Sequence, residues 1–298
     1  MATMSREAAM RAISRVTTRF SWPSLRPLPT NPAVYIILAV ILIVQFFPLA
    51  WALLTSLMTQ QETTTVPATL LPAHPVIASY SAALQGDIGH YFSNSSVAAT
   101  VATLVTMALS TLAAYAFARL RFRFKTTLLL VVLSLSLFPP QVQIIPIYQL
   151  LLKLHLIGTL SGLILPYSVL GLPLAVLILI AVFQDIPVEL EEAAVVDGLS
   201  RLGAFLRIIL PVSLPGLFTA AVVVFVGDWN EYLFALNYTT PNTYTIPVGI
   251  VTISQTQFTT HFDILSAATL ISVVPLVIRI MMMERRMVSG LTAGALGG

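Results

Sequence analysis

Five consecutive residues in an otherwise apolar stretch combine two carboxylates, an amide and two aromatic rings: Asp228, Trp229, Asn230, Glu231 and Tyr232. A charge inside an apolar segment is costly, so it usually faces a cavity or a polar partner. Carboxylates and amides bind sugar hydroxyls, and aromatic faces pack against the C–H surfaces of sugar rings. We predict that these residues line a substrate pathway, with weaker candidates near a group of prolines: Gln141, Gln143 and Tyr148.

Two other interpretations of this run stay open. Asp228 and Glu231 are three residues apart, which places them on one face of a helix, where they could relay protons. Asn230 and Glu231 could instead bridge neighbouring helices, or a second protein chain, as polar packing contacts.

A second group of charged residues lies in ELEEAAVVDGLSRLGAFLRIILPVSLPG, from Glu189 to Gly216. It holds four acidic and two basic residues, although charged residues make up only 9% of the chain. Pro187 favours a helix start, and Asp197-Gly198 is a turn signal, because glycine is preferred where a helix ends in a left-handed residue. The stretch is therefore predicted to begin with a short acidic helix.

A second short helix should follow the turn. Ser200 can cap it, and Pro211 and Pro215 are expected to stop it before the next apolar stretch. Its apolar residues recur at i, i+3, i+4 and i+7: Leu202, Phe205, Leu206 and Ile209. Segment 184–215 is thus predicted to be a helix–turn–helix, and a solvated amphipathic loop is the simpler alternative.

The composition indicates that a bilayer surrounds these two segments. Apolar residues make up 57% of the 298 residues, and the mean hydropathy is +0.91, beyond what a soluble core needs. The absence of cysteine excludes disulfides and thiolate metal sites. The four histidines have no paired spacing, so no metal or cofactor site is expected in this chain.

Six segments are long and apolar enough to cross a membrane. They cover about 33–57, 97–120, 126–145, 162–183, 217–236 and 264–283. The third is interrupted by Pro139, Pro140 and Pro146, so its outer half is expected to kink and to continue as a short surface helix through Leu150.

Basic residues gather on one side of these spans. Of the fifteen Lys and Arg residues, fourteen lie before the first span or at and beyond the ends of the second, fourth and sixth, and Lys153 lies on the other side. The positive-inside rule makes the basic side cytoplasmic. We predict a multi-pass plasma-membrane protein with both termini in the cytoplasm and with 33–298 as its transmembrane domain.

Residues 1–32 form a separate basic segment. A cleaved secretory signal is disfavoured, because the apolar run that follows is too long and five more spans come after it. In REAAMRAISRVTTRF, apolar residues fall near one helix face and Arg11, Arg15 and Arg19 on another. This suits a helix on the anionic inner leaflet, and an unstructured tail that only sets the topology is equally compatible.

The segment from Glu192 to Pro211 fits the pattern EAA-x3-G-x9-I-x-LP at each specified position. It resembles the signature of permease subunits of binding-protein-dependent ABC importers. AAYAFARLRFRFK, FPPQVQIIPIYQL, GDWNEYLFAL and ERRMVSGLTAGALGG also resemble the carbohydrate branch, above all the shorter, six-span second permease of maltose-type systems. The resemblance covers 33–298. Such subunits often end Gly-Ala-Val-Lys-Gly, but this chain ends Gly-Ala-Leu-Gly-Gly, so a tail contact made by that lysine is in doubt.

This resemblance implies an all-α integral membrane subunit of a bacterial or archaeal importer. It would take up a di- or oligosaccharide, such as maltose, maltodextrin or trehalose, with another polyol or glycerol phosphate as the alternative. Its partners would be a related second permease, two copies of a cytoplasmic ATPase and an extracytoplasmic sugar-binding protein, and no nucleic acid. The sequence has no GxxxxGK[ST] phosphate loop, so ATP and Mg would bind to the ATPase subunits and this chain would not itself be an enzyme.

In such importers the helix–turn–helix is the mechanical joint to the ATPase. By resemblance, Glu192 would pair with a cation of the ATPase and Gly198 would permit the bend. Leu202, Phe205 and Leu206 would supply apolar contact. The predicted coupling residues are Glu191, Glu192, Ala193, Ala194, Asp197, Gly198, Leu202, Phe205, Leu206, Ile208, Leu210 and Pro211. The uncharged outer segment 237–261 would reach toward the binding protein or simply cap the spans.

Three other protein classes fit less well. A proton-coupled secondary transporter could use Asp228 and Glu231, but it would not explain the EAA pattern. An intramembrane hydrolase needs a base or a second aspartate in the membrane, and every histidine lies in or beside an outer segment. A membrane anchor needs no charged coupling helices. The sequence therefore favours an importer permease.

Overall fold

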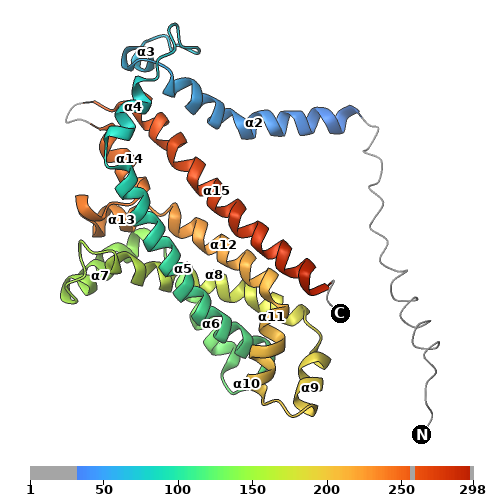
Figure 1. Cartoon of the computed structure of the whole chain (residues 1–298). Coiled ribbons are helices and arrows are strands. Elements are labelled where there is room, and N and C mark those ends of the chain that lie inside the picture. Colours follow the sequence, from blue (N-terminus) through green and yellow to red (C-terminus); the bar gives the residue numbers. More distant parts are fainter. Residues whose placement is uncertain (1–31, 256–258, 296–298) are drawn as a thin grey trace. The chain divides into compact units, whose positions relative to one another are not determined.

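The computed structural model describes residues 32–255 and 259–295, and over these ranges the chain is built of helices (Figure 1). The chain divides into two compact units, Met1–Trp51 and Ala52–Gly298. The described part of the first unit belongs to the apolar helix α2 (Pro32–Ser56), in which Phe47 stacks on Trp51 with ring centroids 6.3 Å apart. The basic segment predicted for 1–32 lies, apart from its last residue, outside the described residues.

Three long helices form the centre of the second unit. They are α5 (Ile88–Arg119), α8 (Ser161–Asp185) and α12 (Leu214–Trp229). The buried face of α5 carries mainly small residues, which let helix backbones approach closely: Ala98, Ala99, Ala102, Thr103, Thr106, Ser110, Thr111 and Ala114.

Gly171 of α8 is the point where all three helices meet. A Cβ atom at this position would lie 3.2 Å from side-chain carbons of both Thr106 on α5 and Val224 on α12. Thr106 also donates a hydrogen bond of 3.0 Å to the backbone carbonyl of Ser168 on α8. The packing therefore depends on small side chains at this level of the bundle.

Shorter elements lie at the two ends of these helices (Figure 1). Near the start of α5 lie α3 (Gln60–Thr64), α4 (Ala78–Gln85), α7 (Pro140–Lys153), α13 (Leu233–Tyr238), η3 (Pro241–Thr243) and α14 (Ile246–Ser254). Near the end of α5 lie α6 (Lys125–Ser134), α9 (Val188–Val196), α10 (Arg201–Ala204), the π-helix η2 (Phe205–Ile209) and α11 (Leu210–Val212), and η1 (Leu135–Leu137) leads from the end of α6 toward α7. The last helix is α15 (Phe262–Ala295).

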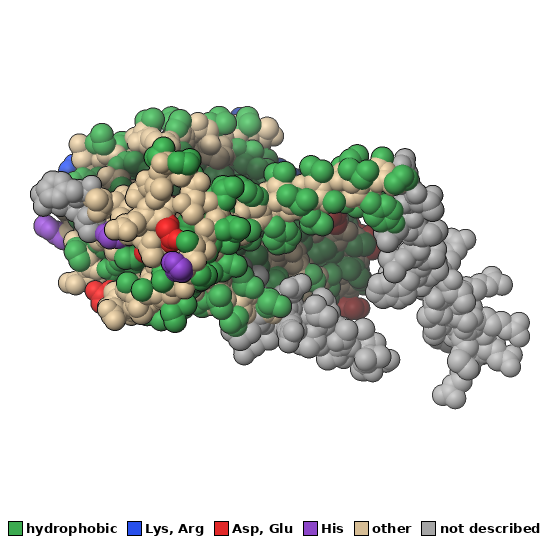
Figure 2. Space-filling model, turned by 90° about the horizontal axis from the view of Figure 1, so that it is seen from above, with side chains coloured by type: hydrophobic (Ala, Val, Ile, Leu, Met, Phe, Trp, Pro, Cys, Tyr) green, Lys and Arg blue, Asp and Glu red, His purple; other side chains and the backbone are tan. Residues whose placement is uncertain are grey.

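The predicted all-helical membrane fold is confirmed. Among the described residues, α2, α5 and α8 are long and apolar enough to cross a membrane, and up to five spans result if each of two bent helix pairs counts as one. The apolar part of α15, Phe262–Ile278, is shorter. Figure 2 shows hydrophobic side chains spread over the visible surface, with acidic side chains at isolated points. Such a surface suits contact with lipid.

The kink expected in the third span is confirmed, and the fifth span is also not a single helix. Within the third, η1 ends at Leu137, and α7 then departs at a bend of 100°. The break falls at Phe138-Pro139, because a residue before proline disfavours the α conformation. The fifth span was expected to reach residue 236, but α12 ends at Trp229 and the chain resumes as α13 at Leu233.

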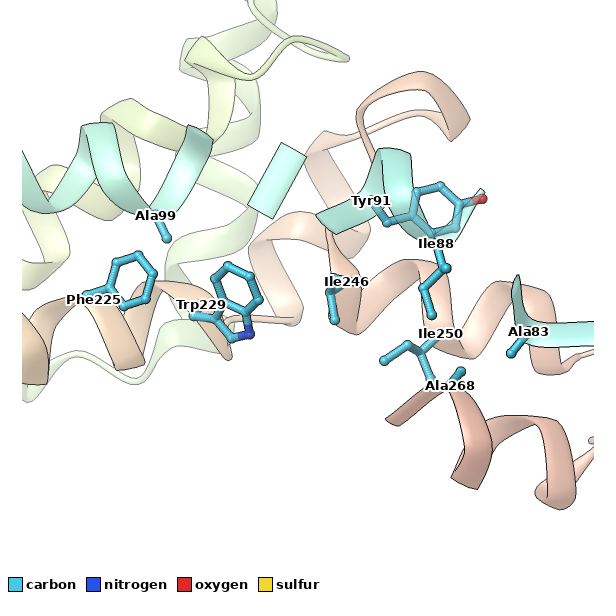
Figure 3. Close-up of a cluster of buried hydrophobic side chains, with 9 residues drawn as sticks. All are labelled: Ala83, Ile88, Tyr91, Ala99, Phe225, Trp229, Ile246, Ile250 and Ala268. Atoms are coloured by element: carbon cyan, nitrogen blue, oxygen red, sulfur yellow. The ribbon is translucent and has the colours of Figure 1, made fainter. Parts of the chain in front are cut away.

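The outer segment 237–261, expected to reach toward a binding protein or to cap the spans, contains a helix that the sequence analysis did not predict. Its helix α14 is packed into the bundle, where Ile246 and Ile250 join the apolar cluster shown in Figure 3. The backbone N–H of Ile246 donates to Ser95 Oγ at 2.8 Å. Gly249 packs so close to Tyr91 that a Cβ atom would lie 2.0 Å from its ring. The placement of 256–258 lies outside the described residues.

Candidate functional site

The segment between α8 and α12 folds as the predicted helix–turn–helix. Helix α9 is followed by a turn in which Gly198 has a left-handed φ of +93°. Ser200 then caps α10 by accepting a hydrogen bond of 3.1 Å from the backbone N–H of Gly203. We call 188–212 the coupling loop.

The second helix stops between Pro211 and Pro215, as expected. It continues through η2 and α11 to Val212, and the chain then bends by 72° into α12. The wider π turn pairs the N–H of Leu210 with the carbonyl of Phe205. This relieves the conflict between a proline ring and the carbonyl one turn earlier.

Exposure divides the predicted coupling residues into two groups. Glu192, Leu202 and Leu206 are exposed, the two leucines by 63% and 50%. Ala193, Asp197, Gly198 and Pro211 are also exposed, whereas Ile208 and Leu210 are half-buried.

Phe205 and Ala194 are only 2% and 3% exposed. Phe205 is thus part of this chain's own core rather than of the apolar surface predicted to contact an ATPase. The exposed surface has an apolar residue that the sequence analysis missed, Val196, which is 86% exposed beside the turn. An apolar residue directly before a turn signal was the available clue.

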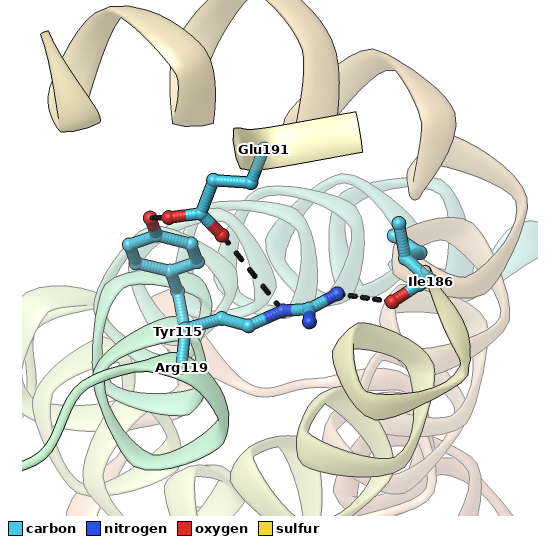
Figure 4. Close-up of polar contacts among 4 residues, drawn as sticks. All are labelled: Tyr115, Arg119, Ile186 and Glu191. Atoms are coloured by element: carbon cyan, nitrogen blue, oxygen red, sulfur yellow. Dashed lines mark hydrogen bonds and ion pairs between the residues drawn. The ribbon is translucent and has the colours of Figure 1, made fainter. Parts of the chain in front are cut away.

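Glu191 also points inward, and it ties α9 to the end of α5 (Figure 4). The Tyr115 hydroxyl donates a hydrogen bond of 2.7 Å to Glu191 Oε1. The Arg119 Nε lies 4.0 Å from Glu191 Oε2, and both side chains are largely buried, with 8% and 13% exposed. Arg119 also donates from Nη2 to the carbonyl of Ile186. Neither Tyr115 nor Arg119 was a predicted site residue, although their i, i+4 spacing places them on one helix face.

A cavity of about 910 Å³ lies beside this contact, between the end of α5 and the coupling loop. Its charged lining comes from Arg119, Arg121, Lys125, Glu191, Glu192 and Arg201. Four basic groups face two acidic ones, and Glu191 is already held by Tyr115 and Arg119. The cavity is therefore net positive and suits acidic groups of a partner.

The pathway candidates lie at the far end of α12, and Trp229 is not free to contact a substrate. Its side chain is 4% exposed and belongs to the apolar cluster in Figure 3. It meets Phe92 edge-on with ring centroids 5.3 Å apart and lies 5.7 Å from Phe225. Trp229 therefore fixes the end of α12.

Glu231 is held by three donors within the chain. The buried Tyr167 hydroxyl donates to Oε2 at 2.8 Å, and the N–H of Ala235 reaches the same oxygen at 3.1 Å. The N–H of Phe234 donates to Oε1 at 2.9 Å. The carboxylate therefore caps α13, in agreement with the packing alternative for this residue.

The other candidates differ in their exposure and in their contacts within the chain. Asn230 is exposed, and its amide donates to the carbonyl of Val226 on its own helix at 2.8 Å. Asp228 is half-buried, and Thr103 Oγ1 lies 3.4 Å from its Oδ2. Tyr232 is half-buried against a second apolar cluster.

The weaker candidates all lie on α7. Gln143 donates to the carbonyl of Phe138 at 2.9 Å, Gln141 is exposed, and Tyr148 lies 6.2 Å from the Tyr238 ring. The Tyr238 hydroxyl donates to the carbonyl of Ile144, which attaches α13 to α7. Asn230, Gln141 and Tyr148 are therefore the exposed candidates, whereas Asp228 is half-buried.

With this geometry in view, comparison with known proteins gives the family. The family model described as "Binding-protein-dependent transport system inner membrane component" matches residues 107–291. The chain belongs to this family. The matched range contains the coupling loop, all of α8 and α12, most of α15, and the last part of α5 with Tyr115 and Arg119.

Full-length relatives agree. The chain is 39% identical to the sulfoquinovosyl glycerol transport system permease protein SmoH of Agrobacterium fabrum, covering 90% of this chain and 94% of the relative. It is 35% identical to the trehalose/maltose transport system permease protein MalG of Thermococcus litoralis, covering 86% and 93%. It is 34% identical to the trehalose transport system permease protein SugB of Mycobacterium tuberculosis, covering 84% and 92%.

The fold also matches a solved structure, a bacterial ABC transporter involved in the import of the acidic polysaccharide alginate. The TM-score is 0.68 over 96% of this chain and 99% of the other, at 15% sequence identity. This permease is therefore an ABC importer subunit in family and in fold.

Proposed function

We propose that this permease takes up a di- or oligosaccharide, delivered by an extracytoplasmic binding protein, through alternating access driven by a partner ATPase. The observation that carries the proposal is the coupling loop. It presents Glu192, Leu202 and Leu206 outward, while Glu191 and Phe205 hold it to the membrane helices. Such an arrangement can receive movement from an external partner.

The exposed residues of the coupling loop would contact one of two ATPase copies, which bind ATP and Mg. Glu192 would pair with a basic side chain there, and Val196, Leu202 and Leu206 would bury apolar surface. A related second permease would complete the translocation pathway. The basic residues beside the loop support a cytoplasmic position for this end by the positive-inside rule, and both termini of this plasma-membrane protein would then be cytoplasmic.

The candidate pathway residues favour a neutral sugar. They include Asp228 and Asn230, and no basic side chain is among the predicted set. Carboxylates attract hydroxyl donors and repel anions. Trehalose or maltose, named for two of the relatives, fits this chemistry better than a sulfonated glycoside or glycerol phosphate, which are anions, and a neutral polyol is the alternative. The hydrogen bonds that occupy Glu231 weaken the proton-relay alternative.

The proposal predicts a stable complex. When the tagged protein is purified from its host in mild detergent, a second permease and an ATPase with a GxxxxGK[ST] loop should remain bound, as identified by mass spectrometry. Glu192→Lys should release the ATPase, because it reverses an exposed charge at the proposed contact while the second permease stays bound.

Asp87→Lys is the matched control, because Asp87 is another exposed acid but lies at the opposite end of α5. It should leave the complex intact. A protein recovered alone under these conditions would contradict the proposal and return the proton-coupled transporter to first place.

Asn230→Ala should weaken transport without disrupting assembly. The substitution removes an exposed amide whose recorded bond is to its own helix. Loss of one substrate hydrogen bond of about 1–1.5 kcal/mol should raise the sugar concentration for half-maximal uptake about tenfold. Uptake kinetics in proteoliposomes measure this change.

Asn237→Ala provides the control, since Asn237 is also exposed and donates to its own helix, at Leu233. It should leave uptake unchanged. If Asn230→Ala instead dissociates the complex, Asn230 is a packing residue between the permeases.

A further inference from the structure

Besides its covalent connection to α8, the coupling loop has two routes into the membrane, and they differ in rigidity. The first runs along the chain from α11 into α12 and contains the π turn η2, Pro211 and a bend of 72°. Breaks of this kind in the backbone ladder are where helices bend. Displacement of the loop is therefore poorly transmitted along this route.

The second route is non-covalent and closely packed. Phe205 of the coupling loop lies 4.3 Å from the Tyr115 ring of α5 and 6.3 Å from the Phe183 ring of α8. Tyr115 and Phe183 meet edge-on at 6.0 Å. All three rings are at most 9% exposed, so the loop is held to α5 and α8 by a dry contact.

Polar contacts reinforce this route at the surface of α5. Glu191 accepts the Tyr115 hydroxyl at 2.7 Å and lies 4.0 Å from Arg119. Arg119 in turn donates to the carbonyl of Ile186, just before α9 begins. One helix turn of α5 is thus attached both to α9 and to the chain segment that leads into it.

Helix α5 connects this attachment to the candidate pathway. It runs from Ile88 to Arg119 without an internal proline. Thr103, whose hydroxyl lies 3.4 Å from Asp228, precedes Tyr115 by twelve residues, or about 18 Å along the axis. A shift at Tyr115 can therefore reach the end of α12 through one unbroken helix.

We propose that Tyr115, Arg119 and Glu191 are positioning residues that transmit movement of the coupling loop to α5. In this arrangement α5, rather than the directly connected α12, carries the movement toward Asp228. The inference rests on the proposed function, because it requires an ATPase that moves the loop.

The test uses the complete importer, with both permeases, the ATPase and the binding protein, reconstituted in proteoliposomes. Uptake and ATP hydrolysis are measured in the same vesicles for wild type, Tyr115→Phe, Glu191→Gln and the double variant. Tyr115→Phe keeps the buried ring, and Glu191→Gln is nearly isosteric, so both should assemble. We expect hydrolysis within about twofold of wild type and sugar moved per ATP lowered about tenfold, the size expected for one lost charge-assisted hydrogen bond.

Because the two residues act through one contact, the double variant should move no less sugar per ATP than the more strongly affected single variant. Glu189→Gln is the matched control, since Glu189 lies exposed on the same helix, and it should retain the wild-type ratio. Hydrogen exchange of the α9 amides should rise in Tyr115→Phe and stay unchanged in Glu189→Gln.

Three results would overturn the inference. The first is an unchanged ratio of sugar to ATP in both single variants, and the second is a double variant in which the two decreases in that ratio multiply. The third is a parallel loss of uptake, hydrolysis and assembly, which would indicate a purely structural contact. Failure of the proposed function itself looks different. In that case the wild-type vesicles would show no sugar-stimulated hydrolysis.

Discussion

Replacing Gly198 with valine is expected to reduce sugar uptake at least about tenfold while the protein still inserts and assembles. Gly198 has φ +93°, and a Cβ atom there would meet nothing within 4 Å. The effect must then come from the backbone alone, because a β-branched residue strongly disfavours this conformation. A cost of about 1–3 kcal/mol would shift the turn between α9 and α10 and move Glu192 away from the ATPase. Uptake and ATP hydrolysis in proteoliposomes measure the change.

Two substitutions make this prediction specific. Gly198→Asn should retain more uptake than Gly198→Val, because asparagine tolerates left-handed φ values better than other side chains. Gly89→Ala should be neutral, since Gly89 also has open space at Cβ but ordinary backbone geometry in α5. Normal uptake in Gly198→Val would mean that the turn conformation is not required for coupling.

Replacing Glu231 with alanine is expected to destabilise the protein rather than simply weaken sugar binding. It would remove the acceptor for Tyr167, which is 2% exposed, and for the N–H groups of Phe234 and Ala235. Leaving a buried hydroxyl and a helix start without an acceptor should cost about 2–5 kcal/mol. Thermal unfolding in detergent should show a lowered Tm and a reduced yield of the complex.

The contacts of Glu231 also define its controls. Glu231→Gln keeps the shape and one acceptor oxygen, so it should lose less stability than Glu231→Ala. Tyr167→Phe removes the buried donor, and combined with Glu231→Ala it should cost less than the sum of the two single changes. A stable Glu231→Ala protein with normal assembly and altered sugar affinity would instead make Glu231 a substrate contact.

Local patterns were enough to predict the fold class and the coupling loop. Long apolar runs can be satisfied only as spanning helices, because a bilayer offers no hydrogen bonds to exposed backbone. The turn at Asp197-Gly198 and the cap at Ser200 were also predictable, since each depends on residues within a few positions. The EAA pattern was informative for the same reason, because its residues are close in sequence.

Features that depend on distant residues were predicted less well. Helix α5 begins at Ile88 rather than near residue 97, and the buried Asn94 in its early turns donates to the backbone carbonyls of Asn242 and Tyr244. Asn94 is polar and lowers the mean hydropathy of any window that contains it, so the predicted span begins after this residue. In the same way, α14 was treated as a loop, although Gly249 and Tyr91 bring it into the bundle.

The sequence by itself determined which elements exist, and only the tertiary structure decided which of their faces are covered. Phe205 has the spacing of an exposed stripe, yet Tyr115 and Phe183 enclose it. Glu191 turns inward toward a hydroxyl 76 positions earlier in the chain, and Glu231 toward one 64 positions earlier. Periodicity fixes the direction of a side chain relative to its own helix. Whether that direction leads to lipid, to a partner or to the core depends on neighbours that the chain brings together only when it folds.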